Sequence, residues 1–170
     1  FSPDSQHIVY AARIGDMWHL VRDGRKEASG RVFISDMYFS ADSRKLVYTE
    51  KYKADGPSRM VVSDLSDKKL LVRESCGDHI VINREKTTVA TICEINRKKR
   101  VVVLSLDAPD SLKEGAIFDT ISNIVFGSDS ASVAYLGVRG EKRFLVVNDR
   151  EDYLPDGNMP WPPAIRPDQK

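Results

Sequence analysis

The segment Phe1-Ser2-Pro3-Asp4-Ser5 is followed by a strand-like run that ends at Tyr10, and this pattern recurs along the chain. Clear copies begin at Phe39 and Phe126, and in each copy the tyrosine stands nine places after the phenylalanine (10 − 1, 48 − 39 and 135 − 126). A degenerate copy begins near residue 82 and a partial copy near 165. The repeat starts are therefore 38, 43, 44 and 39 residues apart.

Each repeat holds several short apolar runs separated by turn residues. In the first repeat these runs cover residues 6–12 and 18–21, a weaker run surrounds Val32 and Phe33, and residues 34–39 lead into the next copy. The third repeat has runs at 89–93 and 101–106, and we expect its outermost strand at 116–118. No helical periodicity of useful length appears. Four strands in roughly 40 residues is the period of a propeller blade. We therefore predict an all-β fold, a β-propeller of four-stranded antiparallel blades, with about four blades in a single domain over residues 1–170.

The aspartate of the motif is best explained as a turn residue. A short carboxylate accepts hydrogen bonds from backbone amides one or two residues further on and closes a tight turn between strands. Asp4, Asp42, Asp129 and Asp168 occupy this position. A catalytic aspartate has no reason to recur in every blade, so we interpret these four as structural. The phenylalanine and tyrosine on either side suit packing between stacked sheets.

The motif, followed by a Val-Tyr strand and the Asp23-Gly24 turn, resembles the WD40-like (PD40) repeats of TolB-type β-propellers. The resemblance implies that the residues before each motif form the innermost strand of a blade. Residues 34–39, 79–82, 122–126 and 163–165 would then line a central channel, and His79 would face it. A periplasmic or secreted location is implied by the resemblance alone.

Two arrangements fit the partial copy near residue 165. Either the terminal strand completes the first blade and closes a four-bladed ring, or the chain is a fragment of a larger propeller. We favour the fragment, because residues 161–163 (Trp-Pro-Pro) lack the alternation of a strong strand. Other propeller blades or a second chain would then complete the ring.

Composition limits the classes of function. The chain of 170 residues is 41% hydrophobic and 30% charged, and its net charge of +1 gives no global attraction to nucleic acid or membranes. No apolar run approaches the length of a membrane-spanning helix. Cys76 and Cys93 lack metal-ligand spacing. We expect a buried free Cys93 and a loop thiol at Cys76, and a single disulfide is the alternative.

Motifs for catalysis, cofactors and metals are absent from the sequence. It has no Gly-x-Ser-x-Gly elbow, no phosphate-binding glycine loop and no His-Glu-x-x-His segment. We therefore predict no catalytic, cofactor-binding or metal-binding residues. The favoured function is a non-enzymatic binding or scaffold module that recognises a protein or peptide through loops on one face. The candidate loops are the long polar segments 51–58 and 108–115. The alternative is the substrate-gating propeller of a prolyl-oligopeptidase-like serine peptidase.

Overall fold

The chain folds into four antiparallel β-sheets, and the computed structural model describes residues 1–66 and 68–155. The first sheet has three strands, β1 (Val9–Ile14), β2 (Met17–Arg22) and β3 (Arg25–Arg31). The second has four, β4 (Phe33–Phe39), β5 (Lys45–Lys51), β6 (Arg59–Asp64) and β7 (Lys69–Glu74). The third holds β8 (Cys76–Ile82), β9 (Thr88–Ile95), β10 (Lys98–Ser105) and β11 (Leu112–Glu114). The fourth holds β12 (Thr120–Phe126), β13 (Val133–Arg139), β14 (Lys142–Val147) and β15 (Arg150–Leu154).

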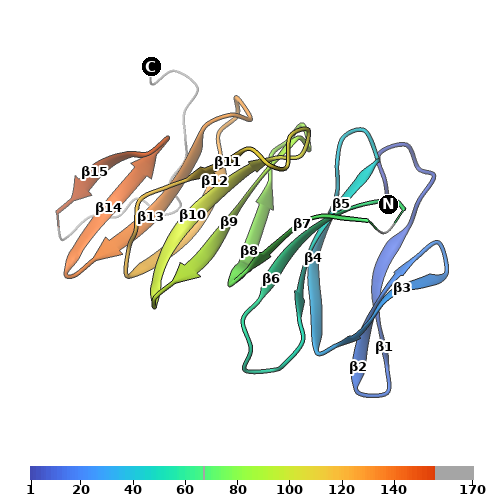
Figure 1. Cartoon of the computed structure of the whole chain (residues 1–170). Helices are drawn as coiled ribbons and strands as arrows, with labels where there is room; N and C mark the ends of the chain where they lie inside the picture. The colour runs from blue at the N-terminus through green and yellow to red at the C-terminus, as the bar shows by residue number, and fades with distance from the viewer. Residues whose placement is uncertain (67, 156–170) are drawn as a thin grey trace.

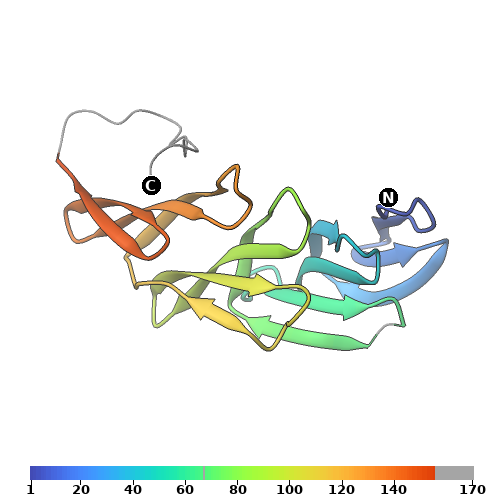
Figure 2. The same ribbon diagram turned by 90° about the horizontal axis from the view of Figure 1, so that it is seen from above.

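The sheets stand side by side in chain order, as Figure 1 shows, and the first and fourth sheets lie at opposite ends of the row in both views (Figures 1 and 2). The described sheets therefore form an open row and not a closed four-bladed ring. The first strands of the second, third and fourth sheets, β4, β8 and β12, contact one another in turn. These strands contain residues 34–39, 79–82 and 122–126. Residues 163–165 lie outside the described part of the chain.

Two strand expectations were wrong. The outer strand of the first repeat is β3, which ends at Arg31 before the run at Val32 and Phe33, because Phe33 already begins β4. The outermost strand of the third repeat is β11, and residues 116–118 follow it. Phe118 forms only an isolated antiparallel bridge with Lys99. Its side chain is fully buried between the third and fourth sheets, which explains the apolar character of this segment.

A separate hydrophobic core fills the space between each pair of neighbouring sheets. Strand alternation sends successive side chains to opposite faces, so each inner sheet contributes to two cores. The motif tyrosines Tyr48 and Tyr135 are both 2% exposed and pack towards the preceding sheet. Tyr10 is 42% exposed. Its neighbours Val9 and Ala11 pack towards the second sheet, so Tyr10 lies on the opposite face of β1.

The two cysteines form a disulfide, contrary to the expectation of free thiols. Cys76 does not lie in a loop. It begins β8 and is paired directly with Cys93 of β9, and the two Cα atoms are 4.0 Å apart. The strand reaches Cys76 because a bulge between Cys76 and Ile80 absorbs Gly77, whose φ is +98°. The disulfide is buried in the core between the second and third sheets.

The four motif copies in the described part of the chain make the same turn. The backbone N–H of the fifth motif residue donates to the carbonyl of the second residue, at 3.0 Å in every copy. The N–H of the second residue donates to the carbonyl of the seventh, at 2.8 to 2.9 Å. The fifth residue has a left-handed backbone each time, and it is Ser5 (φ 61°), Ser43 (φ 60°), Lys86 (φ 56°) or Ser130 (φ 56°).

The structure places Asp4, Asp42 and Asp129 inside these turns. Each carboxylate accepts the backbone N–H two residues further on, from Gln6, Arg44 and Ala131. A hydrogen bond from a serine hydroxyl is the main cause that lowers the pKa of each aspartate. In the third copy the accepting side chain is Asn83, the second residue of the motif. Its Oδ1 accepts from the N–H groups of Thr87 and Thr88. Asp168 lies outside the described residues.

The motif turns are also joined from sheet to sheet. The N–H of Asp4 donates to the hydroxyl of Ser43 at 3.1 Å, and the N–H of Ala41 donates to the carbonyl of Lys86 at 3.0 Å. The side-chain amide of Asn83 donates to the carbonyl of Ser130 at 2.9 Å. These contacts join the four described turns in sequence, and three of the turns also reverse the chain between the first and second strands of their own sheets.

We predict that Asp42→Ala lowers the free energy of unfolding by about 1 kcal/mol at pH 7. The turn then loses the exposed carboxylate that accepts hydrogen bonds from the Ser40 hydroxyl and the Arg44 N–H. The folded-state pKa of Asp42 is lowered, so its contribution is present above the unfolded-state value and is lost as the pH falls through the folded-state pKa. Urea unfolding at pH 7 and below pH 4 measures both effects. The exposed Asp107→Ala is the control, and an equal loss in the control at pH 7 would contradict the turn's role.

Candidate functional site

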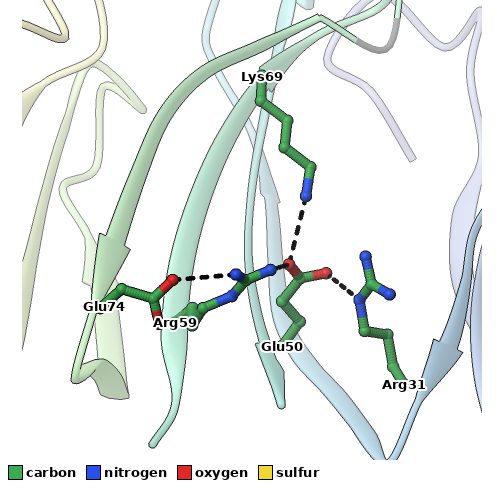
Figure 3. A network of polar contacts seen from close by, with 5 residues as sticks. All are labelled: Arg31, Glu50, Arg59, Lys69 and Glu74. Carbon is green, nitrogen blue, oxygen red and sulfur yellow. Dashed lines mark hydrogen bonds and ion pairs between the residues drawn. The ribbon is translucent and has the colours of Figure 1, made fainter. Parts of the chain in front are cut away.

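A buried carboxylate near the end of β5 contacts three cationic side chains. Glu50 is completely buried. Its Oε2 accepts from Nε of Arg31 at 2.6 Å, and its Oε1 accepts from Nη2 of Arg59 at 2.5 Å. The Lys69 ammonium lies 3.4 Å from the same Oε1. Figure 3 shows the three cationic groups pointing towards the carboxylate from different strands.

The network follows from the strand register. Glu50 on β5 stands directly opposite Arg59 on β6, and Arg59 stands opposite Glu74 on β7. Opposite charges at directly paired positions attract one another across a sheet. Arg59 also donates to Glu74 at 2.9 Å. Arg31 is the last residue of β3, so its bond to Glu50 joins the first sheet to the second.

Glu50 stays charged in this setting. Burial raises its pKa, but the hydrogen bonds from Arg31 and Arg59 and the nearby positive charges outweigh burial, so the pKa is lowered overall. Burial, together with the charge of Glu50, raises the pKa of neighbouring Tyr48 well above its usual value. A buried carboxylate with this many partners is costly to disrupt, because removing one member leaves the others uncompensated.

The arginines bound to Glu50 also hold an exposed aromatic ring. The guanidinium carbons of Arg31 and Arg59 lie 3.8 Å and 4.0 Å from the ring centroid of Tyr52. The ring therefore contacts two guanidinium groups that are both hydrogen-bonded to the carboxylate of Glu50. Tyr52 is nevertheless 42% exposed. An exposed aromatic side chain that is already immobilised loses little conformational entropy when it binds a partner.

The loop that carries Tyr52 forms one wall of a polar cavity. The cavity has a volume of about 380 Å³ and is bounded by residues 51 and 55–58 on one side and by Ser75 and Glu94 on the other. A backbone bond joins the two walls, since the N–H of Cys76 donates to the carbonyl of Ser58 at 3.1 Å. Within the second wall the N–H of Glu94 donates to the carbonyl of Ser75 at 2.7 Å. The buried disulfide lies next to this junction. The candidate loop 51–58 therefore carries an exposed tyrosine, and other residues of the same loop border the cavity.

The other residues singled out from the sequence lie elsewhere. His79 is exposed and lies in the bulge of β8. Segment 108–115 is not a loop throughout, because it contains β11, which pairs with β10. It contributes Lys113 and Gly115 to a second cavity, between the third and fourth sheets. Among residues 1–66 and 68–155, no group of three or more His, Cys, Asp or Glu side chains is placed to hold a metal ion. The described residues also contain no helix that could cross a membrane.

Comparison with known proteins identifies the fold. No protein-family model and no curated protein matches the chain. Among solved structures, the propeller domain of the Trilobed protease from Pyrococcus furiosus superposes with a TM-score of 0.55 at 18% identity, covering 73% of this chain and 43% of that chain. TolB from Acinetobacter baumannii gives a TM-score of 0.55 at 12% identity, covering 87% and 41% respectively.

The described sheets are blades of a β-propeller. The Dos1 propeller supports the same assignment, with a TM-score of 0.57 at 12% identity over 93% of this chain and 47% of that one. The chain thus spans less than half the length of each of these three structures. At these identities the likeness shows the fold alone.

We predict that Glu50→Gln destabilises the chain by about 3 kcal/mol at pH 7, because two arginines keep their charges beside a neutral amide. The lowered pKa of Glu50 means that its charge contributes stability above the unfolded-state pKa. That contribution is lost as the pH falls through the folded-state value, so the difference from the parent chain shrinks in acid. Denaturant unfolding between pH 7 and pH 3 measures this change.

The matched control is Glu141→Gln, which neutralises an exposed carboxylate in the turn between β13 and β14. The control should change the unfolding free energy by less than about 0.5 kcal/mol. If Glu50→Gln behaves like Glu141→Gln, the network contributes nothing to the packing of the first two sheets.

Proposed function

We propose that the chain is a non-enzymatic binding module that recognises a protein or peptide partner through the end of the sheets carrying loop 51–58. The proposed recognition element is Tyr52 together with the cavity that other residues of the same loop border. The same loop stands at the opposite end of β5 from the Asp42 turn, so structural and recognition tasks are separated along the strand.

The observation that carries this proposal is the clamped, exposed ring of Tyr52. Tyrosine and arginine side chains supply much of the binding energy at protein interfaces, especially where their conformation is fixed in advance. Here Arg31 and Arg59 hold the ring of Tyr52, and their own positions are fixed by hydrogen bonds to the completely buried Glu50. The polar cavity bordered by residues 51 and 55–58 of the same loop offers further polar groups to a partner segment.

A second candidate is the gating propeller of a serine peptidase. The supporting observation is the likeness to the propeller of the Trilobed protease and to acylaminoacyl peptidase from Pyrococcus horikoshii, which superposes with a TM-score of 0.52 at 16% identity over 73% of this chain. Only 25% of the peptidase chain is covered. Labelling of the natural, full-length protein with a serine-directed fluorophosphonate distinguishes the candidates, because the binding module stays unlabelled.

We predict that a photo-crosslinking amino acid at position 52 captures a discrete partner in cells of the source organism, whereas one at Ser128, in a motif turn, does not. Once that partner is purified, Tyr52→Ser should weaken its binding about tenfold, because the clamped ring is lost. Binding is measured by calorimetry.

The matched control is Tyr153→Ser, which removes another exposed tyrosine, on β15, whose ring packs against Phe144. It should leave the affinity unchanged. Equal capture from positions 52 and 128, or equal losses for the two tyrosine variants, would place recognition elsewhere on the molecule.

A further inference from the structure

The first sheet lacks the strand that begins each of the other three sheets. Strands β5, β9 and β13 directly follow a motif turn, and each is paired on one side with the strand before that turn, β4, β8 or β12. Strand β1 also follows a motif turn, but among residues 1–66 and 68–155 no strand pairs with its other edge. β1 contacts β4, as β5 contacts β8 and β9 contacts β12, so its open edge stands where the other sheets hold a strand.

The open edge presents backbone donors and acceptors at every second residue of β1. The carbonyl of Ile8 accepts the N–H of Asp23, just after β2, at 3.0 Å. Backbone groups in an antiparallel strand point alternately to its two edges. The N–H and carbonyl groups of Val9, Ala11 and Arg13 therefore point away from β2. Such a row of unpaired groups is a template to which a further strand can add.

The side chains beside the open edge are incompletely covered. Val9 is half-buried, whereas the residues at its position in the next two sheets, Val47 and Ala90, are completely buried. On the other face of β1, Ile8 is 37% exposed, and Leu46 at the same position of β5 is completely buried. An added strand would therefore remove apolar surface from water on both faces of β1.

The edge of β1 differs in charge from outer edges of the other sheets. Charged residues on an edge strand discourage further pairing. β7 carries Lys69, Arg73 and Glu74, and β15 carries Arg150, Glu151 and Asp152. In β1, residues 9–12 are uncharged and Arg13 alone has a charge. β1 therefore offers an edge that an apolar strand can approach.

The strands that hold this position in the other sheets show which sequence fits it. Residues 34–38 (Ile-Ser-Asp-Met-Tyr) and 121–125 (Ile-Ser-Asn-Ile-Val) share an isoleucine, a serine, an Asp or Asn, and two large, mainly apolar residues, whereas β8 shares only the last two positions. The two isoleucines are 6% and 7% exposed. Asp36 and Asn123 lie in bulges with left-handed backbones (φ 51° and 56°). Asp and Asn adopt this conformation more readily than other non-glycine residues.

We propose that the open edge of β1 binds an extended segment of a partner protein with the sequence Ile-Ser-Asx followed by two large apolar residues. The segment adds antiparallel to β1 and takes the place that β4 and β12 hold in their sheets. By the register of β4 on β5, its serine lies opposite Ala11 and its isoleucine opposite Ala12. A small residue suits this place, because Ile121 lies opposite Gly137 in the fourth sheet.

The bound segment ends before the motif. The N–H of Ser2 donates to the carbonyl of His7 at 2.9 Å, and the second motif residue makes the same bond in the second sheet, directly after Phe39. Phe1 therefore already stands at the position of Phe39. A matching peptide stops one residue short of the motif phenylalanine.

The test is a titration of the 170-residue chain with the capped peptide Thr-Ile-Ser-Asn-Ile-Val, the sequence of residues 120–125, followed by amide NMR. The proposal predicts saturable shifts and slower hydrogen exchange at the amides of Val9, Ala11 and Arg13, because they gain acceptors. The same peptide N-methylated at serine keeps its side chains but loses the N–H that bonds to Ala11. It should bind at least tenfold more weakly.

Variants locate the site. Ala11→Pro removes the N–H at the centre of the edge and should abolish binding, and proline is tolerated where an edge N–H faces outward. Ala12→Glu places a charge opposite the incoming isoleucine and should weaken binding at least tenfold. Ala108→Glu, at an exposed alanine between β10 and β11, is the matched control and should have no effect. Urea unfolding checks that each variant stays folded.

The proposal is overturned if the N-methylated and unmodified peptides bind equally, or if no saturable change appears at β1. It is also overturned if the natural, full-length protein fails to bind the peptide, because a segment of that protein would then cover the edge. Tyr52→Ser should bind the peptide as tightly as the parent chain, so the result is independent of the proposed Tyr52 surface.

Discussion

Two backbone hydrogen bonds close each of the four described motif turns, and the remaining architecture depends on them. They force the fifth residue into a left-handed conformation, which non-glycine residues adopt at a cost. In the second, third and fourth sheets the turn reverses the chain between the first and second strands, whereas the turn at residues 1–5 precedes β1. Successive turns also contact one another from sheet to sheet. The side chain that accepts the remaining amides is an aspartate in three copies and Asn83 in the other.

The repeat pattern was sufficient to predict the all-β propeller fold, because turn chemistry and strand alternation are local properties. It also indicated which side chains pack between sheets, and Tyr48 and Tyr135 are buried in this way. Tyr10 has the same position in the motif and is exposed, because no described sheet packs on that face of β1. Whether a repeated residue is buried thus depends on the presence of a neighbouring sheet as well as on the local sequence.

The sequence could not predict features that depend on pairing between distant residues. The disulfide was missed because Gly77 and Asp78 resemble a turn, whereas β8 passes through a bulge that places Cys76 opposite Cys93. The Glu50 network was missed for a similar reason. Only the register of β5 and β6 shows that Glu50 faces Arg59, and Arg31 arrives from another sheet. A glutamate at the end of the apolar run 46–49 was the only local signal.

The central claim is that the motif turns hold neighbouring sheets together, and the turn at Asn83 tests it most directly. Asn83→Asp keeps the oxygen that accepts from Thr87 and Thr88 but replaces the amide that donates to the carbonyl of Ser130. Hydrogen exchange followed by mass spectrometry measures the result sheet by sheet. The account predicts reduced protection in both the β8–β11 and β12–β15 sheets, with β1–β3 unchanged. Unchanged protection throughout β12–β15 would contradict it.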